Sequence, residues 1–226
     1  MDDESCPSSW GRARQVQEEV ARFAAGQDPV NPDTLKTVGG IDAAYSGERA
    51  CACVVVMEYE SLGEKARATA TSRVSFPYVP GYFAFREIPA LLEALRLLSP
   101  LPDLLLVHGH GYAHPRRAGI ATHLGVLLGV PTIGIAENLL GGMEAQAPEN
   151  RDGATSPVVM DGEVVGSLLR PGVGRTPLCV SPGFRTTLRQ ATGIALRCTR
   201  DHRLPEPLYM ADRCAGRFLK EAGTGD

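Results

Sequence analysis

One stretch of the chain gathers side chains that could do acid–base or anion-binding chemistry. The apolar run 104–107 leads directly into three histidines and two arginines, namely His108, His110, His114, Arg116 and Arg117. Imidazole groups move protons or bind metals near neutral pH, and guanidinium groups bind phosphate. A buried strand that ends in polar groups is how open α/β sheets build ligand sites. The alternative is an ordinary strand exit with histidines on the surface.

Three carboxylates stand apart from the other acidic residues. Asp42 lies inside an apolar, strand-like run, where burial is costly unless a cation or hydrogen-bond donors are near. Its alternative role is to cap a turn. Glu87 falls in the first turn of a predicted helix, where the helix dipole favours an anion, so capping explains it without function. Asp212 lies on the last predicted helix.

The segment 76–82 holds two prolines and three aromatic residues. Prolines fix the backbone, and Tyr78 between them is suited to act as a wedge or a stacking platform for a base. The alternative is a rigid connector whose tyrosine packs on the core. Composition alone favours the connector.

The elements that must position these residues follow from hydrophobic spacing. Three β-like runs with short polar turns, 38–46, 51–57 and 66–74, predict an antiparallel meander. Strand 104–107, helix 119–128 and strand 131–136 predict a right-handed parallel crossover, which brings the strand ends at His108 and Glu137 side by side. Further helices are predicted at 10–25, 87–98, 185–192 and 208–219, a hairpin with an Asp161-Gly162 turn at 158–169, and a mobile loop at 144–156.

Composition sets the broad class of the protein. A chain of 226 residues with 43% hydrophobic residues suits one domain, 1–226, with flexible ends at 1–9 and 221–226. The net charge of −3 gives no overall attraction to nucleic acid, so such binding requires a local basic patch. The six cysteines form no C-x-x-C pair, and buried free thiols are expected. With no signal peptide and no membrane-length apolar run, we expect a cytoplasmic protein.

Three antiparallel strands followed by parallel β-α-β units, with acids on the first strand and the last helix, are typical of an α/β fold of the ribonuclease H-like type. Such a fold has a mixed sheet flanked by helices. Phosphodiester hydrolysis on this layout needs Mg²⁺ held by several carboxylates, which activates water and stabilises the leaving oxygen.

Over roughly residues 10–220 the chain resembles the endonuclease V family. The resemblance rests on motifs in a shared order: Gly39-Gly40-Ile41-Asp42, Phe76-Pro77-Tyr78-Val79-Pro80-Gly81, Phe85-Arg86-Glu87, Gly111-Tyr112-Ala113-His114-Pro115-Arg116-Arg117, Pro131–Ala136, Ser181-Pro182-Gly183 and Arg203–Pro207. Any one of these motifs could arise by chance, but their order and spacing together are specific.

The resemblance implies metal-dependent cutting of a nucleic-acid strand one nucleotide beyond deaminated adenine, with Mg²⁺, or Mn²⁺ as an alternative. DNA is the expected partner and RNA a further one, and a monomer is expected. By resemblance, Asp42 is a metal carboxylate, Glu87 holds or supports the metal, and Asp212 orients water. Pro77 and Tyr78 form the wedge, and the pocket for the flipped base comprises Gly81, Phe83, Gly109, His114 and Arg116. Six cations are candidate phosphate contacts: Lys36, Arg73, Arg86, Arg116, Arg117 and Arg185.

Three positions depart from the family pattern. The family has Asp where this chain has His108, Lys where it has Glu137, and His where it has Phe184. In one hypothesis the site is rewired: Glu137 replaces the missing carboxylate, and neutral His108 is a ligand or its hydrogen-bond partner, which suits Mn²⁺ better than Mg²⁺. In the other, the chain binds inosine-containing nucleic acid without cutting it. Retention of Asp42, Glu87 and Asp212 favours activity.

Overall fold

The computed structural model describes residues 9–74 and 76–223. Within them one mixed sheet of nine strands runs through the molecule in the order β3-β2-β1-β4-β5-β9-β8-β7-β6. The strands are β1 (Thr37–Ser46), β2 (Arg49–Glu58), β3 (Glu64–Arg73), β4 (Leu104–His108), β5 (Thr132–Ala136), β6 (Glu144–Ala145), β7 (Thr155–Met160), β8 (Glu163–Leu169) and β9 (Leu178–Pro182).

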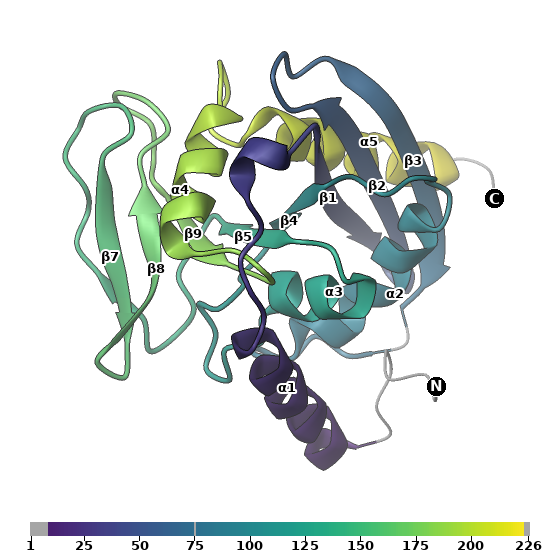
Figure 1. The fold of residues 1–226 in the computed structure, drawn as a ribbon. Helices are drawn as coiled ribbons and strands as arrows, with labels where there is room; N and C mark the ends of the chain where they lie inside the picture. Colours follow the sequence, from purple (N-terminus) through teal and green to yellow (C-terminus); the bar gives the residue numbers. More distant parts are fainter. Residues whose placement is uncertain (1–8, 75, 224–226) are drawn as a thin grey trace.

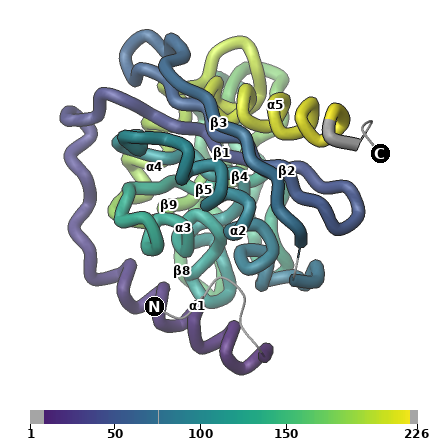
Figure 2. The backbone as a smooth tube through the Cα atoms, turned by 90° about the vertical axis from the view of Figure 1, so that its right-hand side faces the viewer, coloured from purple at the N-terminus to yellow at the C-terminus, as the bar shows by residue number. Residues whose placement is uncertain are grey.

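The helices form a layer on each side of this sheet (Figures 1 and 2). They are α1 (Trp10–Ala25), α2 (Phe83–Leu95), α3 (Ile120–Leu128), α4 (Leu188–Arg197) and α5 (Glu206–Gly223), with a short 3₁₀ turn at Pro32–Thr34. Helices α4 and α5 cover one face of the sheet, α2 and α3 cover the other, and α1 packs outside α3. None of the described helices is long and apolar enough to cross a membrane.

The apolar run before His108 is a strand buried on both faces, as predicted. In β4, Leu104 and Leu106 pack toward α4 and α5, whereas Leu105 and Val107 pack toward α2 and α3. All four side chains are fully buried. Because β4 pairs in parallel with both β1 and β5, its carboxyl end lies between theirs. The predicted meander β1-β2-β3 and the crossover β4-α3-β5 are both confirmed.

A glycine allows α5 to lie close against β1. A Cβ atom added to Gly40 would stand 2.1 Å from the carbonyl carbon of Pro207, at the start of α5. No other residue fits there without moving the helix. From this contact α5 continues along β1, which brings Asp212 toward the middle of the strand.

Several predicted boundaries were wrong. Helix α2 begins four residues before the predicted start because Phe83–Arg86 continue the helical pattern, and Pro89 lies inside the helix. Helix α4 begins at Leu188 rather than 185, since Thr187 and Gln190 form a capping box there. Helix α5 extends beyond its predicted 208–219 at both ends. The segment 144–156 is not all loop, because β6 pairs with β7. The hairpin turn at Asp161-Gly162 is confirmed, with positive φ at both residues.

The chain ends lie partly outside the described residues. Residues 1–8 and 224–226, which the sequence predicts to be flexible, are among those not described, as is Cys6. Ser9, also predicted flexible, caps α1 by accepting a hydrogen bond from the Arg12 amide, and residues 221–223 belong to α5. The expectation of free, buried thiols is confirmed for the five described cysteines.

Candidate active site

The predicted acids and histidines converge on one open pocket of about 870 Å³ at the carboxyl ends of β1, β4 and β5. Asp42 comes from β1, Glu87 from α2, His108 from the end of β4, and Asp212 from α5. We call these four residues the pocket floor. Glu137, directly after β5, also lines the pocket. The structure therefore brings together all five residues for which the sequence suggested a catalytic role.

The best-defined contact in the pocket floor joins Asp42 to His108. Asp42 is buried, its Oδ2 lies 2.9 Å from His108 Nδ1, and its Oδ1 accepts the Ala43 amide at 2.8 Å. Burial alone would lower the pKa of His108, but the hydrogen bond to Asp42 and the charges of Asp42, Glu137 and Glu87 together raise it to about 9. His108 is thus a cation at neutral pH, not the neutral imidazole of the rewired-site hypothesis. It would have to lose its proton to coordinate a metal.

Glu87 is almost fully buried beside Asp42. Burial and the negative charge of Asp42 raise the pKa of Glu87 well above its ordinary value, against the opposing influence of Tyr45, His108 and Arg86. Because α2 begins at Phe83, Glu87 lies beyond the first helical turn, and the capping role suggested by the sequence does not apply. The fold thus buries the Glu87 carboxyl group beside a second carboxylate, and such a strongly shifted pKa is typical of functional sites.

Asp212 reaches the pocket floor from α5, and Glu137 lies at the pocket rim. Burial and the charge of Asp42 raise the pKa of Asp212, with a smaller contribution from Glu137. The Glu137 carboxylate has a partner of its own, since Arg203 Nη1 donates to its Oε1 at 2.6 Å. Asp42, rather than Glu137, therefore binds His108.

A second cluster fixes the loop that borders the pocket. The Gly81 carbonyl oxygen is within hydrogen-bond distance of Gln17 Nε2 at 3.0 Å, His114 Nε2 at 3.1 Å and Arg116 Nη2 at 2.6 Å. Arg116 Nε also donates to Gln17 Oε1 at 2.6 Å. We call these four residues the loop anchor. They join α1, the 77–81 loop and the 109–118 segment, which lie far apart in the sequence.

The loop anchor holds His114 as a neutral imidazole. The Arg116 backbone amide donates to His114 Nδ1 at 3.2 Å, so the ring proton belongs on Nε2, where it can bond to Gly81. Burial and the charge of Arg116 lower the pKa of His114 to about 4, although the Gly81 bond opposes that shift. His114 lines the pocket, whereas Arg116 stacks on Tyr82 outside it, 4.4 Å from the ring centroid.

Comparison with known proteins shows which family this chain resembles. The endonuclease V family model matches residues 18–213. Endonuclease V of Roseiflexus castenholzii is 45% identical over 215 residues, covering 95% of this chain and 96% of that protein. A crystal structure of endonuclease V from Streptomyces avermitilis is 41% identical, with a TM-score of 0.90 and 96% of each chain covered.

The chain belongs to the endonuclease V family. The predicted ribonuclease H-like α/β fold is confirmed by these structural neighbours. One further neighbour, Ciona intestinalis endonuclease V carrying a D234N substitution, was crystallised with a 23mer DNA containing an inosine followed by a ribo-adenosine. That structure is 29% identical to this chain, with a TM-score of 0.82 and coverage of 94% of this chain and 97% of the other.

The donor set of this family member suits a divalent cation. Burial, and then the negative charge of Asp42, raise the pKa values of Glu87 and Asp212, and a bound cation would favour the ionised form of both carboxylates. As they stand, the described side chains do not form a group of three or more ready-made metal ligands. Both oxygens of Asp42 are already hydrogen-bonded. The three carboxylates therefore fit a divalent cation in charge and chemical type. His108 would compete with that cation for Asp42.

The predicted wedge lies at the mouth of the pocket. Tyr78 is 68% exposed and meets the Phe83 ring edge-on at 6.1 Å, and both residues line the pocket. Pro77 is exposed next to Tyr78 but is not part of the pocket lining. Gly109 lines the pocket with φ +128°, and a Cβ there would stand 2.5 Å from Ile120 Cγ2, so the turn after β4 requires glycine.

Sequence reasoning missed two polar residues of this region, Gln17 and Tyr45. Gln17 is fully buried in the loop anchor; as a polar residue between Val16 and Val20 on the apolar side of α1, it gave a weak signal. Tyr45 lines the pocket, and its hydroxyl is buried without a hydrogen-bond partner among the described residues. Burial and then the charge of Glu87 raise the pKa of Tyr45. His110, which the sequence had singled out with His108 and His114, lines the pocket, and burial lowers its pKa to about 4.

Proposed function

We propose that this chain is a metal-dependent endonuclease that hydrolyses a phosphodiester near inosine or deoxyinosine in nucleic acid. The observation that carries the proposal is the convergence of Asp42, Glu87 and Asp212 on one pocket in a member of the endonuclease V family. The inosine-containing DNA bound by the Ciona relative supports the substrate class.

In this proposal Asp42 and Glu87 hold Mg²⁺, or Mn²⁺, and Asp212 orients the attacking water. A metal held there would supply Lewis-acid stabilisation of the phosphate and of the departing oxygen. His108 binds Asp42 from the side and adds a positive charge beside the phosphate, rather than acting as a metal ligand. Hydrolysis would form one phosphorus–oxygen bond to water and break one to the sugar oxygen; Asp212 would accept a proton from the water, and the departing sugar oxygen would take up a proton from solvent.

The loop residues would recognise the base. Tyr78 with Pro77 fills the gap left by a flipped nucleotide, because an exposed aromatic ring beside a proline stacks at little entropic cost. Gly81, Phe83 and Gly109 would line the space for the inosine ring. His114 and Arg116 contribute indirectly, since both hold the Gly81 carbonyl.

The test uses labelled oligonucleotides, DNA and RNA, that carry one inosine, with adenine-matched oligonucleotides as controls. We expect nicking of the inosine strand with Mg²⁺ or Mn²⁺, no nicking with EDTA, and no nicking of the controls. Absence of nicking with every divalent metal would contradict the enzyme proposal.

One observation favours a second candidate, a family member that binds inosine-containing nucleic acid without cutting it. His108 stands where the family pattern has Asp, and as a cation it already neutralises Asp42. His108→Asp separates the candidates. If the wild-type protein binds but does not cut, and His108→Asp cuts, the second candidate holds. If the wild-type protein cuts and His108→Asp changes only its rate or metal preference, the first holds.

A further inference from the structure

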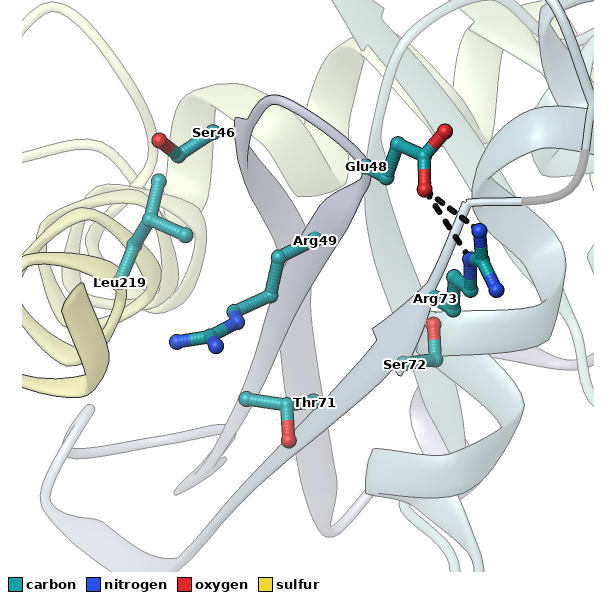
Figure 3. Close-up of a pocket in the computed structure, with 7 residues that line it drawn as sticks. All are labelled: Ser46, Glu48, Arg49, Thr71, Ser72, Arg73 and Leu219. Carbon is teal, nitrogen blue, oxygen red and sulfur yellow. Dashed lines mark hydrogen bonds and ion pairs between the residues drawn. The ribbon is translucent and has the colours of Figure 1, made fainter. Parts of the chain in front are cut away.

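The last two residues of β1 face different pockets. Side chains alternate between the two faces of a strand, so Tyr45 and Ser46 point in opposite directions. Ser46 lines a polar pocket of about 570 Å³, in which Arg73 is paired with Glu48 (Figure 3). Tyr45 lines the candidate active site together with Glu87. Tyr45 therefore brings a phenol group to the pocket that holds the three carboxylates.

The Tyr45 hydroxyl is a buried donor whose partner is missing. Its oxygen is buried and makes no hydrogen bond to any described residue. Leaving a buried hydroxyl unpaired costs about 1–3 kcal/mol, and native structures rarely contain such a group without a functional reason. We therefore looked for the group to which this hydroxyl would donate when the site is in use.

The neighbour of this hydroxyl is Glu87. Among the charged groups around it, Glu87 acts on the hydroxyl most strongly, ahead of Arg86 and Asp42. Because electrostatic influence falls with distance, the hydroxyl lies beside the Glu87 carboxyl. Glu87 is almost fully buried, so few other donors can reach it. The unpaired donor thus stands next to a carboxyl group of the pocket floor.

Arg86 holds the tyrosine ring in this position. Its guanidinium carbon lies 4.9 Å from the centroid of the Tyr45 ring, and its Nη1 donates to the Phe76 carbonyl oxygen at 2.9 Å. Arg86 and Glu87 are consecutive residues of α2. One turn of this helix therefore fixes both the ring that carries the hydroxyl and the carboxyl group beside it.

We propose that Tyr45 is a positioning residue for the metal, and that its hydroxyl donates a hydrogen bond to Glu87 when Glu87 holds a divalent cation. This inference rests on the proposed function, because it concerns the same metal carboxylate. Hydrogen bonds from neighbouring residues orient carboxylates that bind metals, and loss of such a partner typically costs about ten- to a hundredfold in metal affinity or activity. Tyr45 acts through Glu87 and does not touch the substrate.

The experiment compares Tyr45→Phe, which removes only the hydroxyl, with Tyr59→Phe. Tyr59 is a matched control, because it is buried, Arg197 covers its ring at 4.9 Å, and it does not line the pocket. Binding of Mn²⁺ to the full chain is measured by calorimetry without nucleic acid, so the result does not depend on cleavage. We expect Tyr45→Phe to raise Kd for Mn²⁺ about tenfold. Tyr59→Phe should bind Mn²⁺ as the wild-type protein does.

Thermal unfolding and steady-state kinetics distinguish positioning from a role in folding. Because the hydroxyl is unpaired without metal, Tyr45→Phe should leave the unfolding midpoint of the metal-free protein unchanged or raise it. Added Mn²⁺ should raise that midpoint less than in the wild-type protein. With saturating Mn²⁺, KM for the inosine oligonucleotide should stay at the wild-type value while kcat falls by about tenfold.

Glu87→Gln shows whether the effect passes through Glu87. In the Glu87→Gln protein, Tyr45→Phe should weaken Mn²⁺ binding no further. Wild-type Mn²⁺ affinity in Tyr45→Phe, an equal loss in Tyr59→Phe, or a further loss in the double variant overturns the inference. A raised KM with unchanged Mn²⁺ affinity also overturns it, because the hydroxyl would then contact the nucleic acid. Mn²⁺ binding without any nicking by the wild-type protein contradicts the proposed function alone.

Discussion

His108 in the pocket floor and His114 in the loop anchor are both largely buried imidazoles, yet their pKa values move in opposite directions, to about 9 and about 4. His108 faces three carboxylates, whereas His114 lies beside Arg116 and accepts a backbone N–H. The pocket floor keeps three carboxylates close together, and His108 compensates only part of their charge, since the pKa values of Glu87 and Asp212 remain raised. The loop anchor satisfies each polar group through hydrogen bonds. Substitutions in the floor should therefore reduce activity without reducing stability, and substitutions in the anchor should reduce stability first.

The largest effect is expected for Glu87→Gln. Loss of a metal-holding carboxylate should reduce cleavage on the order of a thousandfold. The pKa of Glu87 is raised in the folded state, so ionisation disfavours folding as pH rises above about 4.5. Glutamine removes that penalty, and the unfolding midpoint at pH 7 should be unchanged or higher. Glu93→Gln, exposed on the same helix, is the control for both measurements. A variant that is active, or clearly less stable, would contradict the assignment of Glu87 to the floor.

Acid should lower the free energy of unfolding because His114 in the loop anchor resists protonation in the folded state. Its folded pKa is about 4 against an ordinary 6.5, so the unfolded state binds more protons between these values and stability falls as pH falls from 6.5 to 4. The full effect is about 3 kcal/mol of unfolding free energy. His114→Asn should flatten this part of the pH–stability curve in urea unfolding. An unchanged curve for His114→Asn would refute the prediction.

Gln17→Leu tests the loop anchor, as Glu87→Gln tests the pocket floor. It removes the bond to the Gly81 carbonyl and leaves Arg116 Nε without its partner, which should cost about 1–3 kcal/mol of stability. Because the 77–81 loop loses one tether, KM for inosine oligonucleotides should rise a few-fold while kcat changes little. Gln15→Leu, exposed on the same helix, should change neither quantity. A fall in kcat at unchanged stability would mean that the anchor takes part in the chemistry.

The smallest effect is expected for Glu163→Gln, which contacts Tyr112 and Arg117 in the 109–118 segment. Glu163 accepts hydrogen bonds from Tyr112 and Arg117, and the Tyr112 bond is the main cause that lowers its pKa, but it lies at the surface. Exposed pairs of this kind contribute less than about 1 kcal/mol. Thermal unfolding and cleavage should both match the wild-type protein. A marked loss of cleavage would show that the pocket extends to β8.

The fold was largely predictable because the apolar runs that predict strands in the sequence are the segments that the structure buries. The four apolar residues before His108 and the three β-like runs of the meander, separated by short polar turns, each predicted a strand that the structure contains. Helix boundaries were less predictable: the predicted helix 87–98 begins at Phe83 in the structure and continues through Pro89. The pairing of β6 with β7 was not predictable from a polar segment, since two residues carry no periodicity.

The sequence by itself determined the inventory of the site: Asp42, Glu87, His108, Glu137, Asp212 and the Pro77–Gly81 loop, with glycines where the backbone turns or a helix approaches. Only the tertiary structure decided which of these groups pair. Partners such as Asp42 and His108, Glu137 and Arg203, or Gln17 and Gly81 are separated by more than sixty residues, so local sequence does not encode their contact. Burial and neighbouring charge then set each pKa, and both depend on how distant elements pack.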